Sequence, residues 1–209
     1  MKTLVIGANG RIGRQFCTLA AAAGLPVCAM LRDPDQAKHF EADGVDTVTG
    51  DLEGGFEHAF QRCEQVVFTA GSGPDTGADK TLLVDLHGAI RAIDLARDQG
   101  LGRFVMVSAL RADEPLAGPE NLRPYLAAKH AADSYLRHAG IEYVILKPGR
   151  LTDEPASGCI ATDPESVGHL TISRGNVARS LLAVARNRAL RNREYPLLDG
   201  EQPIDTVFA

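Results

Sequence analysis

The sequence contains no tryptophan, few aromatic residues and only four cysteines among its 209 residues. The cysteines, at positions 17, 28, 63 and 159, lie far apart and form no Cys-x-x-Cys pair, which argues against a disulfide framework and a zinc site. The six histidines show no spacing that would place two ligands on one face of an element, so we expect no metal. This cysteine usage is typical of a reducing compartment, and we expect a cytoplasmic location.

An excess of basic residues and a long apolar run are also absent. The formal net charge is -5, whereas a nucleic-acid-binding surface needs a basic face, so we expect no nucleic-acid partner. No run approaches the roughly 18 apolar residues of a membrane span, and the apolar start is too short for a secretory signal, so we expect no membrane association. Hydrophobic residues make up 44%, enough for a core, and the length fits one domain over residues 1–209.

Short apolar runs alternate with amphipathic stretches along the whole chain. The apolar runs predict strands at 3–6, 27–31, 45–48, 65–69, 103–108, 142–147 and 195–198. The stretches between them predict crossover helices. Seven strands that alternate with helices indicate an α/β fold, with a doubly wound, mostly parallel sheet and helices on both faces.

Glycines mark three helix ends in this pattern. Gly24, Gly100 and Gly140 follow predicted helices at 11–23, 78–99 and 124–139, where a left-handed residue commonly ends a helix. We expect loops at 71–77, 109–123 and 149–172, each after a strand, and a small substrate-side region formed by the last two. The late arginine cluster predicts a solvated helix end: Arg186, Arg188, Arg191 and Arg193.

A glycine-rich turn follows the first predicted strand and opens the first helix. The first glycine of such a turn permits the tight bend, the second lets backbone N–H groups approach a pyrophosphate, and the third allows close helix packing. The spacing Gly-x-x-Gly-x-x-Gly therefore predicts a dinucleotide site rather than a simple turn. Its residues are Gly7, Asn9, Gly10, Arg11, Ile12 and Gly13.

The end of the second strand bears on which dinucleotide is bound. Arg32 is placed for the 2′-phosphate of NADP, and Arg11 could supply a second guanidinium, so we predict NADP. Asp33 keeps NAD as the alternative, although Asp33 with Pro34 could equally cap the next helix. After the third strand, Asp51 and Leu52 either flank the adenine or terminate the strand.

Residues suited to proton transfer follow the fifth strand. Ser108 ends that strand, and Tyr125 and Lys129 are four residues apart at a predicted helix start, so they share one face of that helix. A phenol has an ordinary pKa near 10 and needs a neighbouring cation to exchange protons near neutral pH. Their position after a strand and at a helix start makes Ser108, Tyr125 and Lys129 candidate functional residues.

With these motifs the chain resembles the atypical short-chain dehydrogenases/reductases, the compact branch similar to the NAD-dependent epimerases/dehydratases. The resemblance covers nearly the whole chain and implies a Rossmann-type fold. It depends on six segments, namely Gly7-x-x-Gly10-x-x-Gly13, Phe68-Thr69-Ala70-Gly71, Val84-Asp85-x-x-Gly88, Val107-Ser108, Tyr125-x-x-x-Lys129 and Lys147-Pro148-Gly149-Arg150.

The resemblance implies a role for each matching residue. Tyr125 would be the general acid/base, Lys129 would bind the nicotinamide ribose and lower the pKa of Tyr125, and Ser108 would orient the reacting oxygen. Asp85 stands where the family usually has asparagine, which puts the family's proton relay in doubt, and it could instead pair with a helix neighbour.

Three further segments belong to this expected site. Ala70, Gly71 and Ser72 would line the pyrophosphate and ribose, or form an ordinary glycine-rich loop. Pro148 and Gly149 would pass close to the nicotinamide, because glycine permits a close approach. His87 and His130 neighbour the catalytic residues in sequence, but we expect them on helix surfaces.

The sequence thus predicts an NADP-dependent oxidoreductase that moves a hydride to or from a carbonyl or hydroxyl carbon of a small molecule. The alternatives are a nucleotide-sugar epimerase or dehydratase, a non-catalytic NADP(H) sensor, and a reductase that works without the tyrosine. A monomer and a homodimer are both open. Four arginines indicate either an anionic substrate or surface ion pairs: Arg111, Arg123, Arg150 and Arg174.

Overall fold

The computed structural model describes residues 2–73 and 75–209. A central nine-stranded sheet has the order β11-β8-β10-β6-β5-β4-β1-β2-β3. Its strands are β1 (Thr3–Ile6), β2 (Val27–Leu31), β3 (Asp46–Thr49), β4 (Gln65–Phe68), β5 (Arg103–Val107), β6 (Glu142–Pro148), β8 (Cys159–Ala161), β10 (Arg193–Asp199) and β11 (Gln202–Pro203).

Every pairing from β3 through β10 is parallel, and β8 joins antiparallel to both β10 and β11. The chain winds from β1 to β3 in one direction and then crosses to β4 on the other side of β1. This reversal places the loops after β1 and β4 on either side of a crevice, where such sheets bind ligands. The predicted doubly wound Rossmann-type fold is confirmed.

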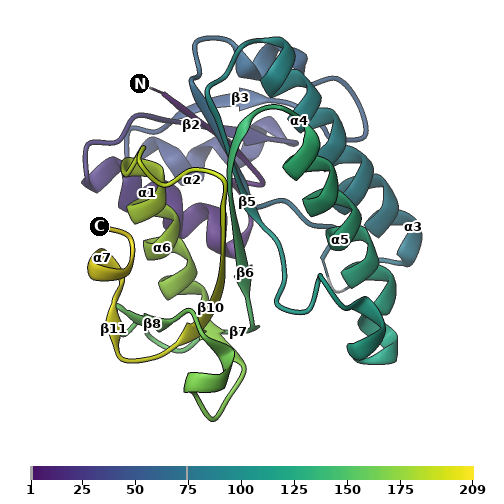
Figure 1. The fold of residues 1–209 in the computed structure, drawn as a ribbon. Coiled ribbons are helices and arrows are strands. Elements are labelled where there is room, and N and C mark those ends of the chain that lie inside the picture. The colour runs from purple at the N-terminus through teal and green to yellow at the C-terminus, as the bar shows by residue number, and fades with distance from the viewer. Residues whose placement is uncertain (1, 74) are drawn as a thin grey trace.

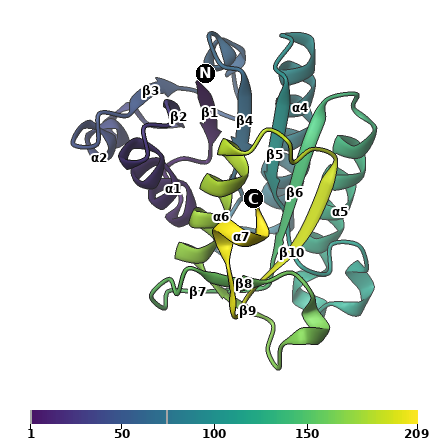
Figure 2. The ribbon, with the colours of Figure 1, turned by 60° about the vertical axis from the view of Figure 1, so that its left-hand side comes forward.

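Helices cover both faces of the sheet (Figures 1 and 2). One face carries α1 (Arg11–Ala22), α2 (Lys38–Glu41), α6 (Arg174–Arg186) and α7 (Ile204–Val207), and the other carries α3 (Ala78–Lys80), the π-helical segment η3 (Thr81–Gly88), α4 (Ala89–Asp98) and α5 (Arg123–His138). Single 3₁₀ turns occur at Pro34–Ala37, Glu57–Phe60, Pro115–Ala117, Glu120–Leu122 and Pro164–Ser166.

The apolar pattern explains this layering. Strands β1, β4 and β5 are buried along their whole length, as expected for strands covered on both faces. Helix α1 buries Phe16, Cys17 and Ala20, which share one face. One of the buried charged residues is Arg103 of β5, whose guanidinium donates to the carbonyls of Val184, Asn187 and Leu190 and so caps the end of α6.

The predicted boundaries are largely confirmed, with two corrections. Gly24, Gly100 and Gly140 all have positive φ at helix ends. The segment 149–172 is not a plain loop, because it contains β8 and a second, two-stranded sheet of β7 (Arg150–Thr152) and β9 (Thr171–Ser173). The predicted helix 78–99 is continuous but passes through η3, in which each turn is wider than in an α-helix.

The late arginines also need a correction, since only Arg186 belongs to a helix end and Arg193 already begins β10. Among the described residues, no helix has the length and apolar character needed to cross a membrane.

Candidate active site

The glycine-rich turn has the geometry that the spacing predicts. Gly7 has φ +85°, and a Cβ added there would lie 2.5 Å from the backbone nitrogen of Ala70. A Cβ on Gly13 would lie 2.4 Å from the carbonyl oxygen of Gly7. Both positions exclude a side chain because β1, α1 and the loop after β4 approach one another closely.

The first turn of α1 offers free backbone donors for a phosphate. Gly10 is the N-cap and provides no side-chain cap, so the N–H groups of the first turn face outward without a side-chain acceptor. The Asn9 side chain and carbonyl both accept from Nε of Arg14, at 2.9 and 3.0 Å, which fixes the turn. Ile12 is half-buried against the core. This cradle fits a dinucleotide pyrophosphate.

At the end of β2, the two residues considered for contact with the cofactor ribose, Arg32 and Asp33, have different surroundings. Asp33 is the N-cap of the following 3₁₀ turn, accepting from the N–H of Asp35 at 2.9 Å, with Pro34 in the first position. The capping interpretation of Asp33 is therefore confirmed. Arg32 is exposed immediately before it.

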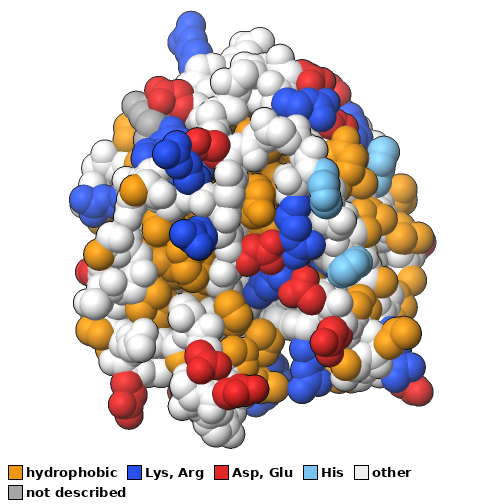
Figure 3. Space-filling view, viewed as in Figure 1, with side chains coloured by type: hydrophobic (Ala, Val, Ile, Leu, Met, Phe, Trp, Pro, Cys, Tyr) orange, Lys and Arg blue, Asp and Glu red, His pale blue; other side chains and the backbone are white. Residues whose placement is uncertain are grey.

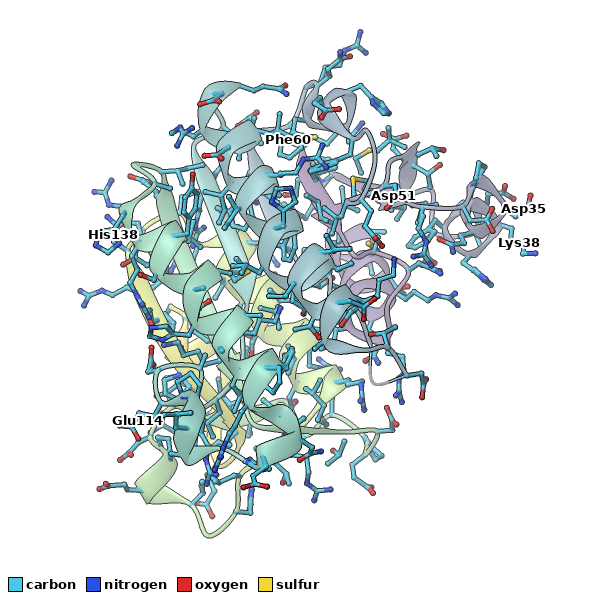
Figure 4. All side chains as sticks on the ribbon, turned by 90° about the vertical axis from the view of Figure 1, so that its right-hand side faces the viewer. Asp35, Lys38, Asp51, Phe60, Glu114 and His138 are labelled. Atoms are coloured by element: carbon cyan, nitrogen blue, oxygen red, sulfur yellow. The ribbon has the colours of Figure 1, made fainter. Side chains whose placement is uncertain are left out.

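The segment after β3 lies nearby. The Asp51 carboxylate accepts from the N–H of Glu53 at 3.0 Å, and Leu52 is buried. Figure 4 shows Asp51 between α4 and the segment that carries Asp35 and Lys38. Asp51 therefore closes the turn after the strand, and its position beside the crevice also leaves the adenine interpretation open.

The side chain of Arg11 pairs with a carboxylate of the segment 149–172. Its Nη1 atom donates to Oδ2 of Asp153 at 2.7 Å, while Nη1 of Arg174 donates to Oδ1 of the same carboxylate at 2.8 Å. Arg11 thus links the glycine turn to the segment 149–172 through an exposed ion pair.

Lys129 lies at the centre of a buried group that we call the Lys129 cluster, comprising Lys129, Asp85, Ser108 and Asp133. Its Nζ atom is 3.2 Å from Oδ1 of Asp85, and both side chains are almost completely buried. The same Nζ lies 3.4 Å from the carbonyl oxygens of Ala70 and Val107. The π-helical segment places Asp85 here, so Asp85 does not pair with a helix neighbour.

Tyr125 stands one turn before Lys129 on α5, and Nζ of Lys129 lies 5.7 Å from the centre of its ring. Burial raises the pKa of Tyr125 above its ordinary value, and the positive charge of Lys129 opposes that rise. Burial opposes the charge on Lys129, but Tyr125 and Asp85 outweigh it and raise the pKa of the ammonium. The predicted lowering of the Tyr125 pKa by Lys129 is thus present, but burial outweighs it, and Tyr125 keeps its proton at neutral pH beside the Lys129 ammonium.

Ser108 is held by a partner that the sequence reasoning missed. Its Oγ donates to Oδ2 of Asp133 at 2.6 Å, across 25 residues of sequence. Asp133 is fully buried, and burial raises the pKa of its carboxyl to about 6, against the opposing hydrogen bond from Ser108. Asp133 follows Lys129 by four residues and Tyr125 by eight, a spacing that could have indicated a shared face.

The other expected site residues lie at the same edge of the sheet. The Ser72 N–H donates to Oδ2 of Asp85 at 2.9 Å, which fixes the loop of Ala70 and Gly71 beside the Lys129 cluster. Pro148 ends β6 and is buried. A Cβ on Gly149 would lie 2.5 Å from the carbonyl oxygen of Leu170, so a glycine is required here for the close packing of this segment against Leu170.

The two histidines are peripheral, as predicted. His87 is exposed, and His130 is exposed with Nδ1 2.9 Å from the carbonyl of Ala112.

A second group of charges, the Lys147 cluster, comprises Lys147, Asp113, Arg137 and Glu194. Lys147 Nζ lies 2.5 Å from Asp113 and 2.6 Å from Glu194, and Arg137 contacts the same two carboxylates at 3.1 and 2.5 Å. The hydrogen bond from Arg137 leads the effects that lower the pKa of Glu194 to about 2. In Figure 3, basic and acidic side chains lie side by side near the middle of the face over β6.

Comparisons with known proteins agree with this architecture. A model of a family described as NAD(P)H-binding matches residues 7–188. Over 208 residues the chain is 41% identical to a Bacillus subtilis protein named uncharacterized sugar epimerase YhfK, with 98% of this chain and 97% of that protein covered.

Two solved structures extend the comparison. One from Bacillus halodurans, named for the NAD-dependent epimerases/dehydratases, matches with a TM-score of 0.95 at 37% identity over 100% of this chain and 98% of that one. ChuY of Escherichia coli O157:H7, named an anaerobilin reductase, matches with a TM-score of 0.82 at 25% identity over 96% and 98% of the two chains. The chain therefore belongs to the NAD(P)H-binding family, and its resemblance to the atypical short-chain dehydrogenases/reductases is confirmed.

Proposed function

We propose that this protein is an NADPH-dependent reductase that transfers a hydride to the carbonyl carbon of a small molecule, with Tyr125 as the proton donor. The observation that carries the proposal is the buried Lys129 ammonium, which lies near both Tyr125 and Asp85. Ala70 connects this ammonium to the glycine turn, because its carbonyl oxygen lies close to Lys129 and its backbone lies against Gly7. Cofactor cradle and proton donor thus lie at the same edge of the sheet.

The nicotinamide of bound NADPH would supply the hydride, and the residues of this chain would bind the cofactor and supply the proton. The glycine turn and the start of α1 bind the pyrophosphate through backbone N–H groups. Tyr125 donates its proton to the oxygen of the reduced carbonyl, and Lys129 stabilises the phenolate that remains. Asp85 keeps Lys129 charged and fixed in place, because the two are paired at 3.2 Å in a buried setting.

The preference for NADPH is supported by Arg32 and Asp33 together. Arg32 is exposed at the end of β2, where the 2′-phosphate of NADP is expected. The Asp33 carboxylate, which would favour NAD, already accepts a backbone hydrogen bond as a helix cap.

The substrate side is formed by the segments after β5 and β6. An open cavity of about 810 Å³ is lined by residues of 155–169 and 199–202, and Ser108, Tyr125 and Lys129 are not among its lining residues. The ion-pair interpretation holds for Arg123 with Glu120 and for Arg174 with Asp153. Arg111 and Arg150 are exposed and lie close in the fold, because the Leu110 N–H donates to the carbonyl of Pro148 at 2.8 Å. They favour an anionic substrate.

An epimerase is the second candidate, because the Bacillus subtilis relative bears that name at 41% identity. An epimerase reaction would use the same tyrosine and lysine but would return the hydride to the substrate. The fate of the cofactor therefore distinguishes the two functions.

The test is deuterium transfer from NADPH labelled at C4 of the nicotinamide to a panel of aldehydes and ketones. We expect one deuterium on the carbonyl carbon of the product and one NADP⁺ released per turnover, with NADH much less effective. Interconversion of a nucleotide sugar in the presence of NADP⁺, without net formation of NADPH, would establish the epimerase instead. Absence of both reactions, with tight NADPH binding by calorimetry, would overturn the enzyme proposal.

A further inference from the structure

Asp133 is a buried carboxyl group that the proposed chemistry does not use directly. It lies on α5 with no exposed surface, and its Oδ2 accepts the 2.6 Å hydrogen bond from Ser108. Its other oxygen, Oδ1, is buried and has no hydrogen-bond partner among the residues that the structure describes. A buried polar atom without a partner is costly, so its presence beside Ser108 requires an explanation.

The cations around Asp133 do not neutralise it by contact. Lys129 precedes it on α5 but pairs with Asp85 at 3.2 Å. Arg137 follows it on α5, and Lys147 belongs to β6, but both pair with Asp113 and Glu194. Their positive charges favour the carboxylate at longer range, whereas burial disfavours it. The carboxyl is therefore poised between its two protonation states.

The protonation state decides which way the Ser108 hydrogen bond runs. A carboxylate can only accept, so Ser108 must donate to Asp133 and offers only oxygen lone pairs to the crevice. A protonated carboxyl can donate through Oδ2 to the Ser108 oxygen, which frees the serine O–H for a substrate oxygen. Only the second arrangement gives a carbonyl oxygen a hydrogen bond from Ser108.

We propose that Asp133 is a positioning residue that sets the direction of the Ser108 hydroxyl, and that Ser108 donates to the substrate only when Asp133 carries a proton. This inference concerns the orientation of Ser108 and rests on the proposed reductase function for its catalytic consequence. The proton moves only between Asp133 and solvent, and no bond of the substrate is broken by it.

The first test is an infrared pH titration that needs no substrate. The carboxylic-acid band lost in Asp133→Asn should disappear from the wild type with a midpoint near pH 6. Because the serine hydrogen bond favours the carboxylate, Ser108→Ala should raise this midpoint by about half a unit to one unit, and Ser108→Thr, which keeps the hydroxyl, should restore it. Asp94→Asn is the matched control, since Asp94 is a helix carboxylate that accepts from the Tyr135 hydroxyl at 2.7 Å, and it should leave the band unchanged.

The second test is the pH dependence of kcat for the aldehyde that acquires deuterium. In the wild type, kcat should fall about tenfold between pH 6 and pH 7.5. The Asp133→Asn amide can donate to Ser108 at every pH, so this variant should lose the decline. A midpoint insensitive to Ser108→Ala, or a decline retained in Asp133→Asn, would overturn the inference. If no aldehyde is reduced, the proposed function fails, while the infrared titration still decides the coupling of Asp133 to Ser108.

Discussion

The Lys129 cluster and the Lys147 cluster use the same kinds of side chain in different ways. In the Lys147 cluster, two cations contact two carboxylates, and every charged group has at least two partners. In the Lys129 cluster, one ammonium is shared among Asp85 and two carbonyls, and one oxygen of Asp133 has no partner in the described structure. A fully paired group is suited to hold elements together, whereas an incompletely paired group retains atoms for a ligand or a proton.

Removal of the single cation should have the largest effect on stability. Lys129→Met leaves the Asp85 carboxylate buried without its partner, which should destabilise the fold by about 3 to 5 kcal/mol. The double variant Lys129→Met/Asp85→Asn should recover much of that loss, because no uncompensated charge remains. Urea unfolding at pH 7 measures both, and equal stability of the single variant and wild type would show that the ion pair is not buried as described.

Glu194→Gln should lower the free energy of unfolding by less than Lys129→Met does, and the size of this loss should depend on pH. Because the pKa of Glu194 is lowered to about 2 in the folded protein, its contribution is present above the ordinary value near 4.5 and is lost as pH falls towards 2. We expect a loss of roughly 2 kcal/mol at pH 7 that shrinks through this window, discounted because the group is partly exposed. The rate of aldehyde reduction should stay within about twofold of wild type. A large loss of rate with little change in stability would place the Lys147 cluster in the catalytic machinery.

Asp133→Asn should change the free energy of unfolding least, and it should stabilise the fold where the other two variants destabilise it. Because the pKa of Asp133 is raised to about 6 in the folded protein, ionisation of Asp133 destabilises the fold. This destabilisation is absent below about pH 4 and grows as pH rises through 6. The variant should therefore gain roughly 1 to 2 kcal/mol over wild type at pH 7.5 and nothing at pH 4. Unfolding curves at the two pH values give the comparison, and a destabilised variant at both would contradict the burial of a charge here.

The local features of the fold could be predicted from the sequence. Buried strands such as β1 and β2 were predicted to the residue because their apolar runs are bounded by turns. The glycine spacing predicted the turn before α1, and the alternation of strands and helices predicted a mostly parallel, doubly wound sheet. The short strands β7 and β9 carry too few residues to show a period, so they could not be predicted.

The candidate site was predictable only in part, because contacts between distant residues have no local signal. Ser108, Tyr125, Lys129 and Asp85 were identified from motifs, and the structure brings them to the same edge of the sheet. The contact of Arg11 with Asp153 spans 142 residues and has no local signal in the sequence. Asp133 was missed because the spacing on α5 predicts its face but not its partner Ser108, which follows β5.

The most direct measurement is the turnover of Tyr125→Phe with saturating NADPH and the aldehyde that accepts deuterium. The phenol-to-phenyl change removes the proton donor and leaves the Lys129 cluster in place, so kcat should fall by about 100-fold or more. The thermal unfolding midpoint and the calorimetric affinity for NADPH should stay close to those of wild type. Turnover within about twofold of wild type would contradict the account, because the proton would then come from another group.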